Sequence, residues 1–348
     1  MIYPKFLQKF DTIAVSAPSD GKTDKLDLIR LDNAYSKLEN IGFKIKEDSN
    51  VRVSINARSA SALVRAKNIL NNFKDKDAKA IISASGGEFL MEILPYIDAN
   101  VIKNNPTWFC GYSDNTALSF FITTALDIAT IYSDNISCFG MDNWHDSVYN
   151  FLEVLKGNII IQNSFSMYQS NYLEYKTGLE GYNLDTKVNW CNLNRQKISM
   201  SGRLVGGCLD VLLNLVGTRY DKVSEFTTRY KDDGIIWFLE SCDLTNEQII
   251  RGLWQLKEAG WFSSTKGFIF GRSVFTKTYT NTSYEDAIKT SLEELDVPII
   301  IGADFGHTAP RMTLINGSYA KIKSIDGKGS IEMLLKWYFE TTEKVYKT

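Results

Sequence analysis

The chain has 348 residues, which is long enough for two domains or one large domain. With 44% hydrophobic and 23% charged residues it has the composition of a globular protein with a full core, which excludes a disordered chain. The net charge of -2 and the pI near 5.9 argue against a nucleic-acid-binding protein, which usually carries a basic face.

In the N-terminal part, apolar strand patterns alternate with amphipathic helix patterns. The segment 78–87 is a continuous apolar run that ends in paired glycines, whereas 24–42 has helical spacing and ends at a glycine. Strands separated by helical segments predict a parallel sheet with helices on both faces. The predicted strands are 11–19, 43–48, 78–87, 107–114 and 129–135, and the predicted helices are 24–42, 59–75, 88–97 and 115–126.

The segment from Trp144 to Lys197 is rich in Asn, Tyr and Ser and has weak periodicity, so we interpret it as a connection that carries irregular strands. After it, 201–218 is interpreted as a turn that leads into an apolar helix. We therefore expect an N-terminal domain over 1–160 and a C-terminal domain over 161–348. The remaining predicted elements are strands at 234–240, 267–272 and 297–304, helices at 246–261 and 283–295, and a β-hairpin over 318–337.

The cysteines and the N-terminus bear on the compartment. Five cysteines without Cys-x-x-Cys spacing fit a reduced compartment better than a disulfide framework, and they predict no zinc site. No long apolar run follows a basic start at the N-terminus, so we expect no signal peptide, no membrane span and a cytoplasmic protein.

Ser113 lies between an apolar strand and a helical segment, in the string FCGYSDNTAL. Such a corner can expose a serine hydroxyl above the end of a sheet, next to the unpaired amides that begin a helix. The string holds only half of a G-x-S-x-G elbow, because the second glycine is missing. This local pattern alone favours the simpler interpretation that Ser113 or Asp114 caps the following helix.

Gly86 and Gly87 follow the preceding predicted strand. Because the carboxyl ends of neighbouring parallel strands share one crevice, this turn is expected beside Ser113. The amides of Gly87 and Asp114 are then candidates for an oxyanion hole. A glycine turn needed only for a tight connection remains the alternative.

Only two histidines are available as an imidazole base. His307 follows a buried strand in a glycine-flanked loop, whereas His145 lies in the polar string DNWHDS and is expected in a surface loop. Glu240 closes an apolar strand, either as an active-site acid or as a solvated strand end. Ser113, His307 and Glu240 would together supply a nucleophile, a base and an orienting acid, each at the end of a predicted strand.

Two other classes of protein stay open at this point. The N-terminal half would fit a flavodoxin-like module that binds a small ligand without chemistry, with Ser113 as a helix cap. A class I amidotransferase-like enzyme would instead use Cys110 as its nucleophile. Cys110, however, lies inside an apolar strand, where a small buried thiol is the simpler interpretation.

The chain resembles the LD-carboxypeptidase family of serine peptidases, which includes the microcin C immunity peptidases. The resemblance covers nearly the whole chain. It rests on the strings AVSAPS, SASGGE, GYSDNTAL, GRLVGGCLDVLLNLVGT, FLESCD, RGLWQLKEAGWF, GFIFGR and PIIIGADFGHTAPRMTLINGS.

The resemblance implies a catalytic triad of Ser113, Glu240 and His307. It implies a flavodoxin-like parallel-sheet N-terminal domain and a β-rich swivelling α/β C-terminal domain, with the active site in the cleft between them. It further implies a homodimer that uses no metal and no cofactor, and that acts on a small molecule rather than on a membrane or a nucleic-acid polymer.

Cytoplasmic members of the family remove the terminal D-alanine from muropeptides during cell-wall recycling, and we take this L,D-peptide bond as the expected substrate. The immunity branch, which cleaves peptidyl-aminoacyl nucleotides, is the alternative. Gly86 and Trp190 are expected to contact substrate. The candidates for binding a terminal carboxylate are Arg203, Arg219, Arg272 and Arg311.

The chain departs from the family pattern around the expected pocket. Ser85 stands where many members have an arginine before the glycine pair, and Glu88 and Phe89 follow the pair in place of Tyr-Gly. The segment Phe139–Met141 lacks the family's proline. These departures leave the predicted triad in place and put the identity of the substrate in doubt.

Overall fold

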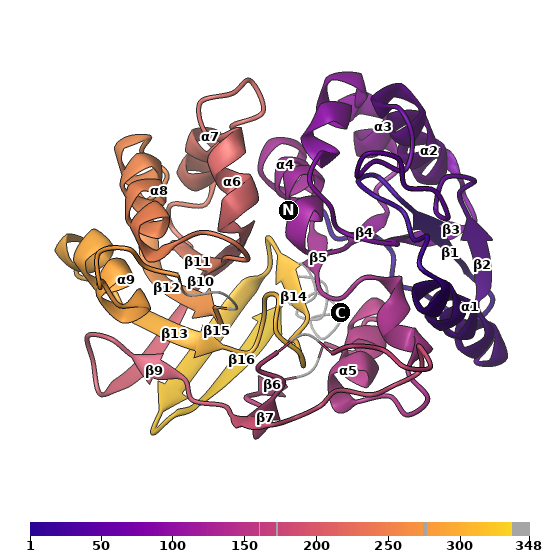
Figure 1. The fold of residues 1–348 in the computed structure, drawn as a ribbon. Coiled ribbons are helices and arrows are strands. Elements are labelled where there is room, and N and C mark those ends of the chain that lie inside the picture. The colour runs from indigo at the N-terminus through magenta and orange to yellow at the C-terminus, as the bar shows by residue number, and fades with distance from the viewer. Residues whose placement is uncertain (160, 172, 274–276, 336–348) are drawn as a thin grey trace, which may run out of the picture.

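The computed structural model describes residues 1–159, 161–171, 173–273 and 277–335. The chain forms two α/β parts, each built on its own sheet, and these parts lie side by side (Figure 1). The mixed α/β fold class expected from the sequence is therefore confirmed. The boundary expected at residue 160 stays a prediction.

Six strands form the first sheet: β1 (Thr12–Ser16), β2 (Lys44–Glu47), β3 (Ala78–Ser83), β4 (Trp108–Cys110), β5 (Thr130–Tyr132) and β14 (Leu314–Asn316). Their order is β14-β5-β4-β3-β1-β2. Strands β1 to β5 are parallel in the order of flavodoxin-like sheets, and β14 returns from the C-terminal part to pair antiparallel with β5. The helices of this part are α1 (Lys25–Asn40), α2 (Ala62–Lys74), α3 (Ala99–Asn104) and α4 (Thr116–Leu126).

Eight strands form the second sheet: β6 (Ile161–Asn163), β9 (Cys191–Asn192), β10 (Lys197–Cys208), β11 (Ile235–Glu240), β12 (Thr265–Gly271), β13 (Ile299–Ala303), β15 (Tyr319–Ile325) and β16 (Lys328–Leu334). Their order is β6-β16-β15-β10-β11-β12-β13-β9, and β10 to β13 are parallel. Strands β15 and β16 form the expected hairpin, although its last two residues, Lys336 and Trp337, lie outside the described residues.

The remaining elements connect and cover these sheets. Strands β7 (Met167–Tyr168) and β8 (Thr186–Lys187) form a small separate sheet. The helices are α5 (Asp146–Leu155), α6 (Leu209–Leu215), α7 (Val223–Arg229), α8 (Asn246–Glu258) and α9 (Tyr284–Leu292). The 3₁₀ segments are η1 (Leu90–Tyr96), η2 (Ser113–Asn115), η3 (Ile136–Gly140) and η4 (Glu293–Leu295).

The interpretation of 201–218 as a turn followed by a helix is wrong in its first half, which is the central strand β10. The glycines that suggested a turn are extended and allow close packing: a Cβ atom on Gly206 would lie 1.7 Å from the Phe238 carbonyl oxygen. Glycine in a strand interior often marks such a close approach of backbone. Only the second half of the segment forms a helix, α6.

Two other predicted segments differ from the structure. The connection after Trp144 contains α5, which buries Val148, Phe151 and Leu152 on one face. The segment 88–97 forms the 3₁₀ segment η1 rather than an α-helix, with Pro95 inside it. A proline removes one helical donor and clashes with the preceding turn, so this segment cannot continue as a regular helix.

An apolar interface joins the two parts. Helix α4 of the first part packs against α6 and α7 of the second, and the Phe120 ring stacks on Trp261 with centroids 5.3 Å apart. The five cysteines all lie in the described part of the chain, and none forms a disulfide. Within the described ranges, no helix is both long and apolar enough to cross a bilayer.

Candidate active site

Ser113 lies at the corner between β4 and α4, at the carboxyl edge of the first sheet. Its φ angle is +63°, a left-handed conformation that is uncommon for a residue with a side chain. Such strained positions concentrate at functional sites. The Ser113 hydroxyl does not cap the helix; it lies 2.9 Å from His307 Nε2.

His307 and Glu240 come from the second sheet. Glu240 is the last residue of β11, and His307 lies in the loop that follows β13. His307 Nδ1 lies 2.7 Å from Glu240 Oε2. A side chain on Gly306 would crowd this pair, because its Cβ would lie 3.0 Å from Glu240 Oε2. Ser113, His307 and Glu240 thus form one continuous chain of hydrogen bonds, with the geometry of a nucleophile, a base and an orienting acid.

Tyr132, at the end of β5, connects the first sheet to Glu240. Its hydroxyl donates to Glu240 Oε1 and accepts a 3.4 Å hydrogen bond from the Ser113 amide. Sequence reasoning missed this residue, although it lies at a strand end, as the predicted Glu240 does. Both carboxylate oxygens of Glu240, which is 1% exposed, therefore have a partner.

Glu240 and His307 shift each other's pKa in opposite directions. Burial alone would raise the pKa of Glu240, but the charge and hydrogen bond of His307 and the hydrogen bond from Tyr132 bring that pKa below its ordinary value. Burial alone would lower the pKa of His307, but the Glu240 carboxylate raises it well above its ordinary value. Glu240 is therefore placed to stabilise an imidazolium on His307.

The glycine turn lies where the sequence predicted it. A Cβ atom on Gly86 would come 3.1 Å from Ser113 Oγ, so only glycine leaves the serine hydroxyl unobstructed from this side. Gly87 has a φ of +147°, and a side chain there would collide with Ser19. The Asp114 amide follows Ser113 in the first turn of a helical segment, where N–H groups lack acceptors within the helix.

The Asp114 carboxylate ties this turn to the serine corner. It is buried and accepts hydrogen bonds from the Ser19 hydroxyl and, at 2.8 Å, from the Leu90 amide. Burial raises the pKa of Asp114, while the bonds from Ser19 and from the backbone act in the opposite direction. Asp114 thus joins two loops of the first part to the segment that carries Ser113.

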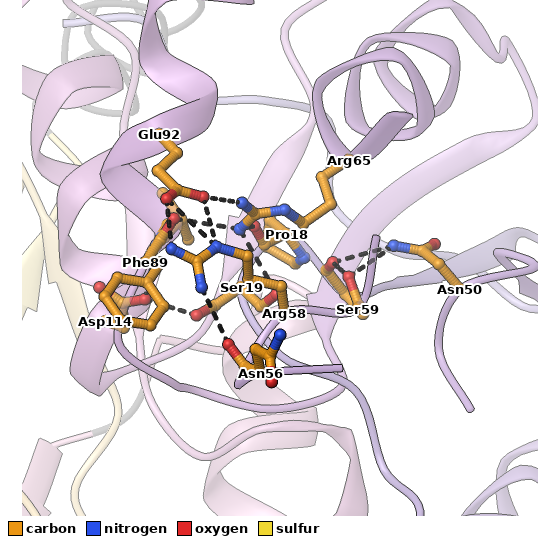
Figure 2. Close-up of polar contacts among 12 residues, drawn as sticks. Pro18, Ser19, Asn50, Asn56, Arg58, Ser59, Arg65, Phe89, Glu92 and Asp114 are labelled. Carbon is orange, nitrogen blue, oxygen red and sulfur yellow. Dashed lines mark hydrogen bonds and ion pairs between the residues drawn. The ribbon is translucent and has the colours of Figure 1, made fainter. Parts of the chain in front are cut away.

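Arg65 holds the loop after β1 and the segment after the glycine turn together. Its fully buried guanidinium donates to the Pro18 carbonyl at 2.9 Å and the Phe89 carbonyl at 3.0 Å (Figure 2). It also pairs with Glu92 at 2.6 Å, and Arg58 holds the same carboxylate from the solvent side. Arg65 therefore ties the loop after β1 to the segment that follows the glycine turn.

A cavity of about 220 Å³ opens beside His307. Its lining combines cations with aromatic rings and includes Arg30, Arg311, Lys22, Tyr112, Tyr175 and Tyr182. The Arg311 guanidinium donates to Asp134 and to the His307 carbonyl, so it also holds the histidine loop. Arg30 donates to three main-chain carbonyls and lies 4.8 Å from the Tyr175 ring centroid. Sequence reasoning missed Arg30, which is part of a regular helix pattern.

The other predicted arginines lie elsewhere. Arg203 is buried and paired with Asp233, and Arg272 is buried and paired with Asp304. Arg219 contacts the hydroxyl of its neighbour Tyr220 at the surface. None of the three lines the cavity, so Arg311 is the one predicted arginine that does.

Trp190 does not lie with the triad. It is 1% exposed, its indole donates to Asp304 at 2.8 Å, and its ring occupies the space above Gly329. Its surroundings are those of a packing residue, and we assign it no substrate contact. His145 lies in the loop before α5, as expected, and is half-buried; it also caps that helix, with its ring accepting from the Ser147 amide.

The cysteine alternative does not fit the structure. Cys110 is fully buried in β4, and burial raises the pKa of its thiol well above the ordinary value. Because the thiolate is the reactive form of cysteine, a thiol in this setting is inert.

Comparisons with known proteins agree on one family. Residues 13–133 match the LD-carboxypeptidase N-terminal domain, and residues 201–322 match the LD-carboxypeptidase C-terminal domain. A relative from Bacillus subtilis, named a probable murein peptide carboxypeptidase, is 27% identical over 333 residues, which cover 94% of each chain.

Solved structures show the same fold. A MccF-like protein from Bacillus anthracis superposes with a TM-score of 0.79 at 27% identity, covering 96% of this chain and 99% of the other. The microcin C7 self-immunity protein MccF in complex with aspartyl sulfamoyl adenosine gives a TM-score of 0.79 at 23% identity, covering 96% and 99%.

Proposed function

The chain belongs to the LD-carboxypeptidase family, and we propose that it is a serine peptidase with Ser113, His307 and Glu240 as its catalytic triad. The observation that carries this proposal is the unbroken path from Ser113 Oγ through the imidazole of His307 to the Glu240 carboxylate, with links of 2.9 and 2.7 Å. Both distances are within hydrogen-bond reach for a nucleophile and its base.

In the proposed reaction, His307 Nε2 removes the proton from Ser113 as the hydroxyl attacks the amide carbonyl. Glu240 holds Nδ1 and stabilises the imidazolium, which then protonates the leaving amine. A water molecule, activated by the same imidazole, hydrolyses the acyl-enzyme and restores Ser113.

The amides of Gly87 and Asp114 are the proposed donors to the tetrahedral oxyanion. Each such donor typically contributes about 3 kcal/mol to transition-state stabilisation. Support comes from the close approach of Gly86 to Ser113 and from the Asp114 and Arg65 hydrogen bonds that fix the turn. A preorganised turn has little reorganisation to undergo when the charge develops.

As substrate we propose the L,D-peptide bond to a terminal D-alanine in muropeptides, hydrolysed for peptidoglycan recycling. An enzyme of this kind must hold a free carboxylate, and arginine suits that task. Arg30 and Arg311 supply cationic groups in the cavity beside His307.

One observation favours the second candidate, cleavage of a peptidyl-aminoacyl nucleotide. The cavity combines Lys22 and two arginines with the rings of Tyr112, Tyr175 and Tyr182, a lining suited to a phosphate and a planar base. A structurally similar protein, MccF, is described in complex with aspartyl sulfamoyl adenosine.

A mass-spectrometric panel separates the candidates. Purified protein is incubated with an L,D-tetrapeptide and with a processed microcin C-type compound, and the released fragments are identified. Release of D-alanine alone supports the first candidate, and release of the nucleotide portion alone supports the second. Ser113→Ala is expected to abolish hydrolysis while the protein stays folded; full turnover by this variant would contradict the nucleophile assignment.

We further propose that the enzyme works as a homodimer in the cytoplasm, on small molecules and without a membrane or nucleic-acid polymer as partner. The family resemblance supports this setting. Light scattering of the purified protein tests the dimer, and fractionation of the producing cells tests the compartment.

A further inference from the structure

Within the described part of the chain, Cys208, Glu240 and His307 are the one group of sulfur, carboxylate and imidazole ligands close enough to share a metal ion. One ligand atom from each residue lies within 4.8 Å of the others, and all three residues are buried. Cys208 ends β10 directly opposite Glu240 in the parallel register with β11, so both side chains come from the same edge of the sheet.

We propose that this group is an inhibitory site for Zn²⁺, with the Cys208 sulfur, a Glu240 oxygen and a His307 nitrogen as ligands. The proposal rests on the proposed triad for its effect on activity, but not for metal binding itself. Sulfur, imidazole and carboxylate are the ligand types that Zn²⁺ uses in proteins.

The spacing fits a metal ion after small side-chain movements. With bonds of about 2.3 Å to sulfur and 2.0 Å to nitrogen or oxygen, tetrahedral ligands stand roughly 3.3–3.6 Å apart. The limit of 4.8 Å is about 1.2–1.5 Å wider than this. Rotation of the Cys208 and His307 side chains would close that gap, and water or the Ser113 hydroxyl would complete four-fold coordination.

The charges around the sulfur favour a cation. Cys208 Sγ contacts Asp210 Oδ2 at 3.4 Å, and Asp210 also accepts hydrogen bonds from the amides of Cys242 and Asp243. Two exposed carboxylates, those of Asp243 and Glu88, lie close enough to Asp210 to form one group of negative charges. Arg311, whose charge lowers the pKa of Glu240, is paired with Asp134. These carboxylates give the Cys208 side of the group a negative potential, which favours a divalent cation there.

Bound Zn²⁺ would inactivate the triad without unfolding the protein. Burial and the neighbouring Glu240 carboxylate raise the pKa of the Cys208 thiol well above its ordinary value, so Zn²⁺ itself must displace the thiol proton, which leaves to solvent. The ion also uses a lone pair of His307 that the reaction needs. His307 bound to metal can no longer accept the Ser113 proton. Hydrolysis would thus be blocked reversibly and would recover when the metal is removed.

Cobalt spectroscopy tests the site on the resting protein. Co²⁺ added to the purified, reduced protein is expected to give the near-ultraviolet charge-transfer band of a thiolate ligand, at one ion per chain, and Zn²⁺ should displace it. Cys208→Ala should lose the band. Cys191→Ala is the matched control, because Cys191 is a more exposed thiol that also contacts a carboxylate, Glu285, at 3.4 Å.

Three results would overturn the site: no band in the unmodified protein, a band retained by Cys208→Ala, or a band lost in Cys191→Ala. If Cys208→Ala melts at a much lower temperature, His307→Gln replaces it and should weaken Zn²⁺ binding at least about tenfold in competition with a chromogenic chelator.

Activity gives a second, separate measurement. Zn²⁺ should inhibit hydrolysis in a way that EDTA reverses, and Cys208→Ala should need at least about tenfold more Zn²⁺ for half-inhibition. The two proposals can fail separately. If the unmodified protein hydrolyses no panel substrate but Ser113→Ala protein still binds Zn²⁺, the proposed function is refuted and the metal site is supported.

Discussion

Replacing Tyr132 with phenylalanine removes one hydroxyl that serves both halves of the triad. The hydroxyl donates to the buried Glu240 carboxylate and accepts from the Ser113 amide. A hydrogen bond to a charged group contributes about 1.5–3 kcal/mol, so we expect Tyr132→Phe to lower the free energy of unfolding by about that amount at neutral pH. The loss should be measurable by urea denaturation.

The catalytic effect follows from the same bond. Glu240 loses the partner that fixes its second oxygen just when it must stabilise a charged His307. We expect kcat/KM to fall about tenfold, which corresponds to about 1.4 kcal/mol of transition-state stabilisation. The substrate is the one that the mass-spectrometric panel identifies.

The pH dependence of the stability loss has a definite sign. The folded-state pKa of Glu240 is below its ordinary value of 4.5, so its interactions stabilise the protein above that pH and are lost as the pH falls through the folded pKa. The stability difference between wild type and Tyr132→Phe should therefore be full at pH 7 and shrink below about pH 4.5.

Tyr230→Phe is the matched control. Tyr230 also donates to a carboxylate, Asp127, at 2.6 Å, and is 9% exposed, but it contacts no residue of the triad. Tyr230→Phe should lower the free energy of unfolding without lowering kcat/KM. If Tyr132→Phe reduces kcat/KM no more than Tyr230→Phe does, the linking role of Tyr132 is refuted.

Three further variants probe the backbone around the site. Gly86→Ala should lower kcat strongly with little loss of stability, because the new methyl group would lie 3.1 Å from Ser113 Oγ; unchanged kinetics would contradict the close approach. Gly206→Ala should fail to give soluble folded protein, since its Cβ would lie 1.7 Å from the Phe238 carbonyl oxygen; a normal melting curve would refute this packing. Arg65→Met should cost about 2–4 kcal/mol in urea denaturation, because the main-chain carbonyls of Pro18 and Phe89 and the Glu92 carboxylate lose a donor, and a loss below about 0.5 kcal/mol would argue against the network.

The sequence singled out Ser113, Glu240 and His307 because each lies at or just after the end of a recognisable apolar strand, and the family resemblance implied their roles. The carboxyl ends of parallel strands meet at one edge within a sheet, but Ser113 follows a strand of the first sheet and the other two belong to the second, so this rule alone could not predict that they meet. Tyr132 also ends an apolar strand but was missed, because the sequence of a short buried strand does not indicate which side chain at its end has a hydrogen-bonding role.

Other residues could not be interpreted without the tertiary structure. The ring of Trp190 packs over Gly329, a residue far along the chain, and no local pattern separates such packing from a ring that stacks on a ligand. Arg30 reads as an ordinary residue of α1 because its carbonyl partners lie more than 100 positions away. The start of α5 was obscured by the polar string around His145, which is the helix cap itself.

The glycine pair in β10 shows how the site depends on the contact between the two sheets. Gly207 lies against the first residue of α4: a Cβ atom there would come 2.5 Å from Thr116 Cγ2, and the next amide, of Cys208, donates to Thr116 Oγ1 at 3.1 Å. Because α4 begins just after Ser113, this approach sets how far the serine corner stands from the second sheet. We expect any larger residue to push α4 outward and to lengthen the 2.9 Å link from Ser113 to His307. The residues that suggested a turn are therefore the ones that allow a nucleophile from one sheet to meet its base from the other.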